Sequence, residues 1–586
     1  MPTGASSFRF REATENSFYL ILSLLMGVAG AFGAQGFKLL IDFFQKQFSS
    51  PERTMSAYLD IGFIGTQASL KLGGFLLIIA SLIAIVLFIS RLQKFHGVAD
   101  TIEGARLPNA QVDIGGGLYS TLIASLSIAG GAPVGQYGPL VHFGATLAAI
   151  LSRYINLTRN ASEVLLACGV AGVISAAFGA PIAAILFVHE VVLRHFSLRT
   201  FAPVTLASVV AYVVMSNLFP IEPFLSPINL SIRSADTILL LILTGLGGGM
   251  LAALFMQICL RTEQATPKLG VPFWCLPFIG AVLLWVVGIY VPQILGQDII
   301  VMKAAISGDI MLGLLILFCL LKLLMAALSI SFGFYAGVFA PALFIGLMFG
   351  AAFGQSAVMV LDMPPAIIGL LALAGMGAVI SSTIGAPIST IIIVFELTHD
   401  YTTTIGVMVS IVFANLLSNR LFGRSLFDRK LLARGVDMSM SRGQYKLSQT
   451  PIKQLVSQDY CALTTDMNYQ QALKHMVATG FSEAYFLDED KILIGKTDLH
   501  KLMQSDNDLG LDQLGQFADF VMLREEMSVL TAMEEMSHFI GESLPVVSDN
   551  GELIGIVTEA DIFRYYLSIN EQSHAEETVS SQAGAS

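Results

Sequence analysis

Long apolar runs separated by short polar segments dominate the first 430 residues of the chain. Runs long enough to cross a bilayer predict transmembrane helices at residues 18–42, 69–92, 201–219, 236–259, 270–292 and 311–330, and a last apolar stretch covers 404–421. Shorter runs bounded or interrupted by Gly and Pro predict half-spanning helices at 139–152, 164–178, 181–193, 335–355, 365–380 and 386–397. Non-helical backbone survives at membrane depth only inside protein or beside a watery cavity. These breaks therefore indicate a candidate ion site.

An internal repeat relates the two parts of this apolar region. Residues 122–139 match 324–341 without a gap, and residues 169–190 match 375–396, so the offsets are 202 and 206. Two matched blocks in the same order indicate a duplicated membrane unit, with halves at about 17–220 and 236–434. Transporters built from inverted repeats bind ions where broken helices meet at the midplane. We therefore predict a polytopic α-helical membrane protein with an inverted internal repeat.

Composition separates this region from the rest of the chain. Mean hydropathy is +0.72 and 54% of residues are hydrophobic, so most of the chain belongs in lipid. From residue 451 onward, however, the chain has 23 acidic and only 7 basic side chains. Such an acidic part cannot neutralise phosphates, which argues against nucleic acid as a partner. The five cysteines lack metal-ligand spacing, and no metal site is expected.

Polarity and charge set the predicted domain boundaries. Residues 1–16 are predicted to be a cytoplasmic N-terminal segment, 17–434 the transmembrane domain, 435–450 a linker, 451–570 a soluble cytoplasmic α/β pair, and 571–586 a disordered tail. The Arg and Lys residues of 420–434 mark the cytoplasmic side, so both termini are predicted to be cytoplasmic. The first apolar run follows no signal pattern and is interpreted as a retained helix.

Two Gly-x-x-x-Pro loops are the candidate ion-binding elements. A small anion in lipid needs donors that cost little to bury, and the N–H groups at helix N-termini provide them. Gly allows close approach of the backbone and Pro starts the helix. The loops are GQYGP at 135–139, with Gln136, Tyr137 and Gly138, and GVFAP at 337–341, with Val338 and Phe339.

These loops resemble those of the CLC family of anion channels and anion/proton exchangers. GVFAP fits the family pattern GxFxP, and GQYGP fits GxEGP at all but one position. The resemblance covers about residues 18–435 and implies the CLC fold of the bacterial type, located in the cell inner membrane (plasma membrane). It also implies a homodimer with one anion pathway per subunit, in which the backbone amides of Val338 and Phe339 contact the anion.

Four departures from the family pattern affect the expected chemistry. His96 and Gly97 align with the family's GxGxP loop, and His96 stands where many members have an anion-coordinating residue. Tyr137 replaces the gating glutamate, so we interpret it as the gate. Val191 replaces the inner proton-accepting glutamate of the exchangers, and Phe427 replaces a pore-lining tyrosine. Two titratable groups and one hydroxyl are therefore missing.

Each candidate also has a structural interpretation. His96 and Tyr137 could be ordinary packed core residues. Glu190 and Glu396, which end two matched helices, are interpreted as partners of helix ends rather than as ion ligands. Lys322 is interpreted as a side chain that snorkels toward an interface.

The soluble part resembles a tandem pair of CBS domains, roughly 451–503 and 511–570. Residues 545–563 resemble the end of a CBS motif, where Gly-x-x-Thr-x-x-Asp follows a strand-turn-strand. The resemblance implies that Thr558 and Asp561 hold the ribose of an adenine nucleotide, a candidate ligand but not a required cofactor. The first half ends with altered spacing at 494–498. The alternative is a module used only for dimer contacts.

From these residues we predict passive, proton-uncoupled transport of a small monovalent anion, with CBS-dependent regulation or assembly and no enzyme activity. A phenol with a pKa near 10 at Tyr137 and an apolar Val191 cannot readily replace two carboxylates. An anion/proton antiporter of the same fold and a non-conducting membrane sensor are the alternatives. The anion stays open between chloride, bicarbonate and nitrate, since His96 can both donate to and accept from a hydrogen-bonding anion.

Overall fold

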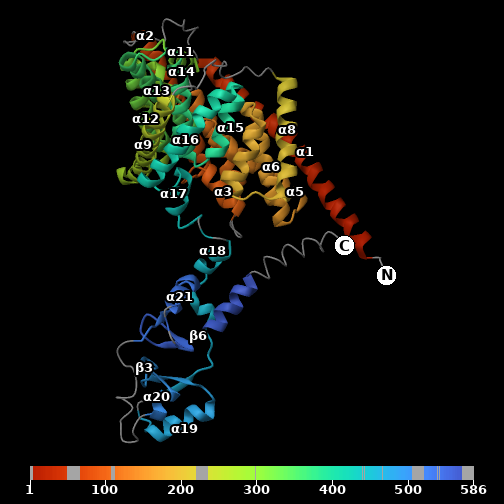
Figure 1. Ribbon diagram of the computed structural model, residues 1–586, viewed down its shortest axis with the longest axis vertical. Coiled ribbons are helices and arrows are strands. Elements are labelled where there is room, and N and C mark those ends of the chain that lie inside the picture. The colour runs from red at the N-terminus through yellow and green to blue at the C-terminus, as the bar shows by residue number, and fades with distance from the viewer. Residues whose placement is uncertain are drawn as a thin grey trace. The chain divides into compact units, whose positions relative to one another are not determined.

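The structure is a computed structural model that describes residues 4–48, 66–106, 112–219, 235–296, 299–438, 440, 442–464, 466–504, 520–537, 539 and 541–569. The chain divides into two compact units, Met1–Val436 and Asp437–Ser586, called here the membrane unit and the C-terminal unit (Figure 1). The division falls within residues 435–450, the predicted linker. The predicted tail, 571–586, lies outside the described residues, whereas α1 begins at Gly4, within the predicted N-terminal segment.

The membrane unit is helical throughout its described residues. Its first part contains α1 (Gly4–Phe48), α2 (Thr66–Ser90), α3 (Val98–Arg106), α4 (Ile114–Ala129), α5 (Tyr137–Ile155), α6 (Arg159–Phe178), α7 (Pro181–Phe187), the π-helical η2 (Val188–Leu193) and α8 (Leu198–Leu218). Its second part contains α9 (Ala235–Ala265), η3 (Thr266–Leu269), η4 (Phe273–Cys275), α10 (Leu276–Tyr290), η5 (Pro292–Ile294), α11 (Ile299–Ser307), α12 (Leu312–Ser331), α13 (Phe339–Leu361), α14 (Ile367–Ile384), α15 (Pro387–Thr398), α16 (Tyr401–Leu421) and α17 (Leu426–Leu432).

Ten segments of the described chain are long and apolar enough to cross a membrane, which confirms a multi-pass membrane protein. Three predicted half-spans are wrong, because α6, α13 and α14 are 20, 23 and 18 residues long and are among the ten. The glycines in these runs do not break the helices but allow close packing. A Cβ on Gly346 of α13 would lie 2.3 Å from the carbonyl oxygen of Gly375 on α14.

The repeated Gly-Ala-Pro sequence has the same structure in both halves. Gly179 ends α6 and Gly385 ends α14, both in the left-handed region at φ of 64° and 71°, which favours glycine. Two residues later, Pro181 and Pro387 start α7 and α15 as the first helical residue.

The two short helices that follow cap each other across the repeat. Glu190 accepts hydrogen bonds from the backbone N–H groups of Ile388 and Ser389 at 3.0 and 2.8 Å. Glu396 accepts two from Ile182 and Ala183, both at 2.9 Å. Each carboxylate thus neutralises the positive end of a helix in the other half. This agrees with the predicted structural role of both glutamates.

The C-terminal unit contains two similar three-stranded sheets. The first has the order β1-β2-β3 and the second β4-β5-β6, and in each the first pair is parallel and the second antiparallel. The elements are α18 (Arg442–Gln449), η6 (Ile452–Leu455), β1 (Cys461–Thr464), α19 (Tyr469–Thr479), β2 (Glu483–Leu487), β3 (Leu493–Asp498), α20 (Leu499–Gln504), β4 (Leu523–Arg524), α21 (Val529–Met536), β5 (Ser543–Val547) and β6 (Leu553–Thr558). A helix over 559–569 follows β6.

A shared core joins the two sheets, and a half-buried ion pair of the first sheet makes hydrogen bonds to Ser543 of the second. The core includes Tyr485 and Leu493 from the first sheet and Val547 and Ile556 from the second. Lys496 lies with its Nζ 2.8 Å from Oε1 of Glu483, and the same Nζ donates to the carbonyl oxygen of Ser543 at 2.7 Å. Burial raises the pKa of Glu483, but hydrogen bonds from Lys496 and Ser543 outweigh burial and hold this pKa below its ordinary value.

Replacing Gly350 by Ala tests the close packing of α13 on α14. A Cβ there would lie 2.0 Å from the carbonyl oxygen of Leu371, and backbone cannot move aside cheaply. We expect Gly350→Ala to destabilise the membrane unit by about 1–3 kcal/mol or more, as overpacking does. The readout is the temperature at which purified protein in detergent loses its monodisperse elution.

Gly313→Ala is the matched control for this substitution. Gly313 lies on α12, and a Cβ added to it would meet no atom within 4 Å. The same added methyl group should therefore leave the transition temperature unchanged or slightly raised. Equal transition temperatures for the two variants would contradict the packing argument.

Candidate functional site

Two loops of the membrane unit bind each other through their backbones. The N–H of Gly135 donates to the carbonyl oxygen of Gly337 at 2.7 Å, and the N–H of Gly337 donates to that of Gly135 at 2.6 Å. The first loop leads into α5 at Tyr137 and the second into α13 at Phe339. The pair of hydrogen bonds therefore holds two helix N-termini side by side.

Only glycine fits at this contact. A Cβ on Gly337 would lie 2.6 Å from the backbone nitrogen of Gly138, and one on Gly135 would lie 2.8 Å from that of Ala340. The first N–H groups of a helix have no partner within the helix and form its positive end. Two such ends meet here, which is the arrangement that binds an anion without a buried charged side chain.

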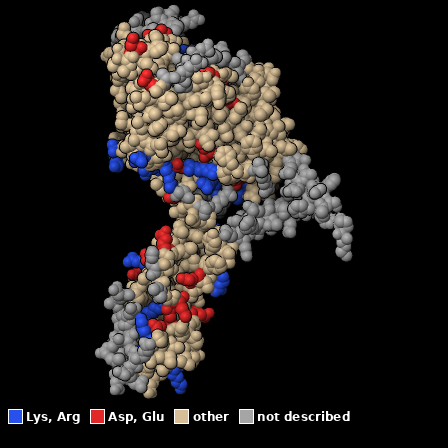
Figure 2. Space-filling model, in the orientation of Figure 1, with Lys and Arg blue, Asp and Glu red and all other residues tan. Residues whose placement is uncertain are grey.

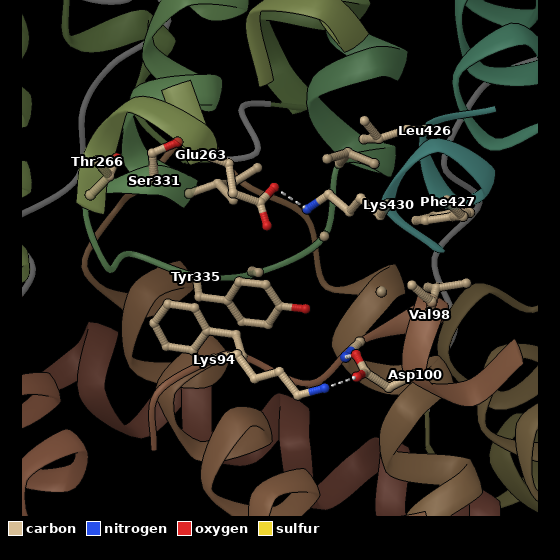
Figure 3. A pocket seen from close by; sticks show the side chains of 18 of the residues that line it. Lys94, Val98, Asp100, Glu263, Thr266, Ser331, Tyr335, Leu426, Phe427 and Lys430 are labelled. Carbon is tan, nitrogen blue, oxygen red and sulfur yellow. Dashed lines mark hydrogen bonds and ion pairs between the residues drawn. The ribbon is translucent and has the colours of Figure 1, made fainter. Parts of the chain in front are cut away.

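A cavity lies on each side of the two helix starts. The α17 cavity, of about 450 Å³, is lined by Gln93, Lys94, Phe95, Gly97, Val98, Ala99, Asp100, Tyr137, Gly138, Glu263, Thr266, Pro267, Val271, Phe273, Leu276, Ile330, Ser331, Tyr335, Ala336, Gly337, Val338, Phe339, Ile384, Leu426, Phe427, Lys430 and Arg434 (Figure 3). The α1 cavity, of about 650 Å³, is lined among others by Lys38, Asp42, Gln136, Tyr137, Lys322, Phe339 and Phe344.

Tyr137 and Phe339 line both cavities and form an aromatic partition. Their rings stack with centroids 4.5 Å apart and planes 16° from parallel. Phe178 and Phe187 pack against the Tyr137 ring at 5.1 and 5.0 Å. Tyr137 is only 3% exposed, and its hydroxyl has no hydrogen-bond partner among the described residues. A donor is therefore buried next to the paired helix starts.

Charged side chains line the α17 cavity in ion pairs. Lys430 Nζ lies 2.6 Å from Glu263 Oε2, and Lys94 Nζ lies 3.3 Å from Asp100 Oδ1, as Figure 3 shows. Arg434 also binds Asp100, with 3.0 Å between Nη1 and Oδ1. Among the described lining residues, three cations thus face two carboxylates, and the balance is positive.

Most of the predicted site residues meet at this partition. Gly97, Gly138, Val338 and Phe427 line the α17 cavity, and Gln136 lines the α1 cavity. Val191, the residue at the family's inner glutamate position, is 1% exposed in η2 and lines neither cavity.

His96, a predicted pathway residue, lies outside the lining of both cavities. Its ring lies against α4, where a Cβ on Gly116 would be 2.5 Å from Nε2. A carboxylate lies on either side of the ring: Asp100 is 3.7 Å from Nδ1 and Asp113 is 3.7 Å from Nε2.

Lys322 also differs from its prediction. It is 2% exposed and does not snorkel, because Nζ donates to the carbonyl oxygen of Ile294 at 2.8 Å and to that of Gly296, and lies 4.6 Å from the Phe344 ring centroid. These partners keep the cation at the wall of the α1 cavity.

Sequence reasoning missed Tyr335, which holds the loop around His96 in place. Its hydroxyl donates to the carbonyl oxygen of His96 at 3.2 Å, and its ring stacks on Phe95 with centroids 4.4 Å apart. A tyrosine two residues before the GVFAP loop was the available signal.

The candidate nucleotide residues of the C-terminal unit bind each other. Thr558 donates through its N–H and its hydroxyl to Oδ2 of Asp561, at 3.0 and 2.6 Å. Asp498 and Lys501 occupy the equivalent positions of the first half, since Asp498 pairs with Glu483 as Thr558 pairs with Ser543. The predicted altered spacing is therefore wrong: the register is the same and the residue types differ.

Comparisons with known proteins identify both units. A family model described as "Voltage gated chloride channel" matches residues 74–419, and a CBS domain model matches 516–568. A relative from Escherichia coli named "Voltage-gated ClC-type chloride channel ClcB" is 28% identical over 57% of this chain and 80% of its own. A relative from Salmonella arizonae named "H(+)/Cl(-) exchange transporter ClcA" is 29% identical over 56% of this chain and 70% of its own.

Solved structures show the same fold. The crystal structure of a eukaryotic CLC transporter has a TM-score of 0.61 at 19% identity, covering 93% of this chain and 97% of its own. A slow cyanobacterial Cl⁻/H⁺ antiporter has a TM-score of 0.59 at 19% identity, covering 71% and 97%. The expected CLC fold with CBS domains is thereby confirmed.

The same comparisons contradict passive, proton-uncoupled transport. Several relatives at 29% identity are named H(+)/Cl(-) exchange transporters, and two structural neighbours are described as a Cl⁻/H⁺ and a fluoride/proton antiporter. Anion/proton exchange, the alternative raised from the sequence, fits these proteins better. The sequence prediction failed because it took the two family carboxylate positions, Tyr137 and Val191, as the only possible proton carriers.

Any adenine nucleotide bound by the C-terminal unit should depend on Asp561. Asp561→Ala removes the acceptor for the ribose hydroxyls, and a lost charged hydrogen bond of about 1.5–3 kcal/mol predicts at least roughly tenfold weaker binding. Titration calorimetry with adenosine phosphates measures this, with Lys501→Ala at the equivalent position as the control. Equal affinities for wild type and Asp561→Ala would refute the assignment.

Proposed function

Because the chain belongs to the voltage-gated chloride channel family, we propose that it transports a small monovalent anion of the chloride type across a membrane in exchange for protons. The single observation that carries the anion half of this proposal is the contact between Gly135 and Gly337. It presents two helix N-termini to one point between two cavities. Bicarbonate and nitrate are further candidates, since backbone N–H groups bind each of these anions.

Cations on both sides of the partition support an anion route. Lys94, Lys430 and Arg434 line the α17 cavity, and Lys38 and Lys322 line the α1 cavity. Rings of basic side chains favour anions in pores. Lys322 is the most buried of these cations, and its carbonyl partners fix its position beside the path.

Tyr137 acts as the gate in this proposal. Its ring and that of Phe339 separate the cavities, so an anion passes only when the stack opens. A neutral phenol has no charge with which to compete against the anion. It blocks the path by its volume and can donate its hydroxyl to the ion.

The proposal includes a setting for the whole protein. The protein forms a homodimer in the inner membrane of a bacterial cell, with one pathway per subunit. Figure 2 shows Lys and Arg side chains gathered at the end of the membrane unit where α17 lies in Figure 1. By the positive-inside rule this end faces the cytoplasm, as do both chain termini. The CBS pair regulates transport or assembly, with an adenine nucleotide as its ligand.

A reversal experiment tests the exchange. Purified protein in liposomes receives an outward chloride gradient with no pH gradient, and a pH electrode follows the outside solution. In an exchanger, the outward flow of chloride drives protons inward although no pH gradient is present. The outside solution should therefore become alkaline. Addition of a protonophore should abolish that pH difference, while liposomes without protein provide the baseline. Chloride efflux with no movement of protons would refute exchange and leave anion transport standing.

Variants of Tyr137 test the gate. Tyr137→Ala removes the ring from the partition, so anion flux should rise several-fold. Tyr137→Phe keeps the ring and loses one donor worth about 0.5–1.5 kcal/mol, so anion affinity should fall roughly two- to tenfold if the hydroxyl contacts the ion. Flux controlled by the neutral phenol should also be insensitive to deprotonation of Tyr137 at physiological pH.

Phe187→Ala is the matched control for the gate variants. Phe187 packs edge-on against Tyr137 but lines neither cavity, so the loss of a ring there should not open the path. Unchanged flux in a well-folded Tyr137→Ala protein would make Tyr137 a packing residue.

A further inference from the structure

His142 is a buried titratable side chain that the anion site does not use. It lies on α5 at 1% exposure, and its Nδ1 is 3.0 Å from the hydroxyl oxygen of Thr101 on α3. Its ring stacks on that of His96, with centroids 5.7 Å apart and planes 25° from parallel. In the part of the chain that the structure describes, Nε2 of His142 has no hydrogen-bond partner.

The hydrogen bonds of Thr101 determine which nitrogen of His142 is free to take a proton. The Thr101 hydroxyl has one hydrogen and donates it to the carbonyl oxygen of Gly97 at 3.2 Å. Nδ1 of His142 must then be the donor toward Thr101, because a hydroxyl with its hydrogen engaged can only accept. In this tautomer Nε2 carries a lone pair and can accept a proton.

His96 connects this buried ring to water on two sides. Asp113 lies 3.7 Å from Nε2 of His96 and its side chain is 58% exposed. Asp100 lies 3.7 Å from Nδ1 and lines the α17 cavity. Protons can therefore reach His96 from bulk solvent or from the cavity, while His142 lies deeper.

The other charged groups around the pair are already engaged. Asp100 binds Lys94 and Arg434, and Arg434 also binds Glu103 of α3. Glu190, on η2 behind α3, is taken by the first N–H groups of α15. The remaining sides of the pair are formed by the Thr146 hydroxyl and by Gly116 and Gly117 of α4. A Cβ on Gly117 would lie 3.1 Å from Nε2 of His142.

We propose that His96 and His142 form the proton-loading station of the exchanger, on the side of the α17 cavity. This inference rests on the proposed exchange function and supplies the titratable groups that Tyr137 and Val191 cannot provide. Imidazole is suited to the task because a ring nitrogen with a free lone pair can bind a proton and release it again. The two rings share a single proton, since two adjacent cations would repel each other.

The loading step is a simple proton transfer. A proton delivered by way of Asp113 or Asp100 forms an N–H bond on His96. When that bond breaks, a new one forms at Nε2 of His142, and His96 is loaded again only after this shared proton has left the pair. No bond other than N–H changes, and no oxidant or reductant is needed.

The experiment measures protons moved per anion in liposomes. His142→Gln keeps a donor or acceptor for Thr101 but cannot carry a proton, so this ratio should fall by about 10²-fold, the lower end of the loss expected when an acid–base group is removed. Asp113→Asn, at an exposed position that should not disturb folding, should reduce the ratio at low proton concentration. A ratio equal to that of wild type in both variants would overturn the proposal.

His189→Gln is the matched control. His189 is also fully buried and also has an Nε2 without a hydrogen-bond partner in the described chain, but it stacks on Phe196 and Phe201 instead of a second histidine. Its substitution should leave the proton-to-anion ratio unchanged. A fall in the ratio equal to that of His142→Gln would show a general effect of losing a buried histidine and would overturn the proposal.

The pH dependence of anion flux separates this inference from the proposed function. If wild type moves anions but no protons, exchange is refuted, and the station is then judged by the pH dependence of anion flux alone. A pH-dependent flux that becomes flat in His142→Gln would still show that the pair binds protons that act on transport. A profile that is the same in wild type and variant would refute the station.

Discussion

The mutual hydrogen bonds between Gly135 and Gly337 are the constraint on which the membrane unit depends. They bring two helix starts closer than any side chain would allow, and everything else at the centre follows from that distance. The residues after each loop, Tyr137 and Phe339, are forced into ring contact. Both rings line both cavities and so lie between them. The proposed anion site, the proposed gate and the two cavities thus share one geometric cause.

An aromatic gate changes the electrostatics of such a site. A carboxylate at the position of Tyr137 could both repel the anion and carry a proton. A neutral phenol can block the anion by its volume, but another group must then carry the proton. In the proposed mechanism the ring stack controls the anion, and other groups bind the proton. His96 and His142 both lie outside the lining of the α17 cavity. The contact between Thr101 and His142 links α3 to α5.

Features with a local cause in the backbone could be predicted from the sequence. Features that depend on side chains distant in the sequence could not. The Gly-x-x-x-Pro loops, the repeat and the roles of Glu190 and Glu396 could be predicted because glycine, proline and helix-end carboxylates have local causes. The lengths of α6, α13 and α14 were underestimated, since a glycine that breaks a helix and one that packs it look alike in a sequence. The orientation of His96 and the burial of Lys322 depend on partners more than ten residues away, at Asp113 and Ile294, and no local pattern encodes them. Proton exchange was misjudged because the sequence interpretation took Tyr137 and Val191 as the only positions that could carry a proton.

The hydrogen bonds of Glu190 and Glu396 are isologous. The glutamate of each half accepts from the first N–H groups of the short helix in the other half. A single half that paired with its own copy would have made both contacts by two-fold symmetry, so the present chain preserves a dimer interface inside one polypeptide. In a fused chain, equivalent positions of the two halves can hold different residues. Ser120 and Lys322, equivalent at the repeat offset of 202, now differ: one accepts from the backbone N–H of His96 and the other places a cation beside the α1 cavity. A symmetric ancestor would have had identical entrances, whereas this chain can treat the two faces of its membrane differently.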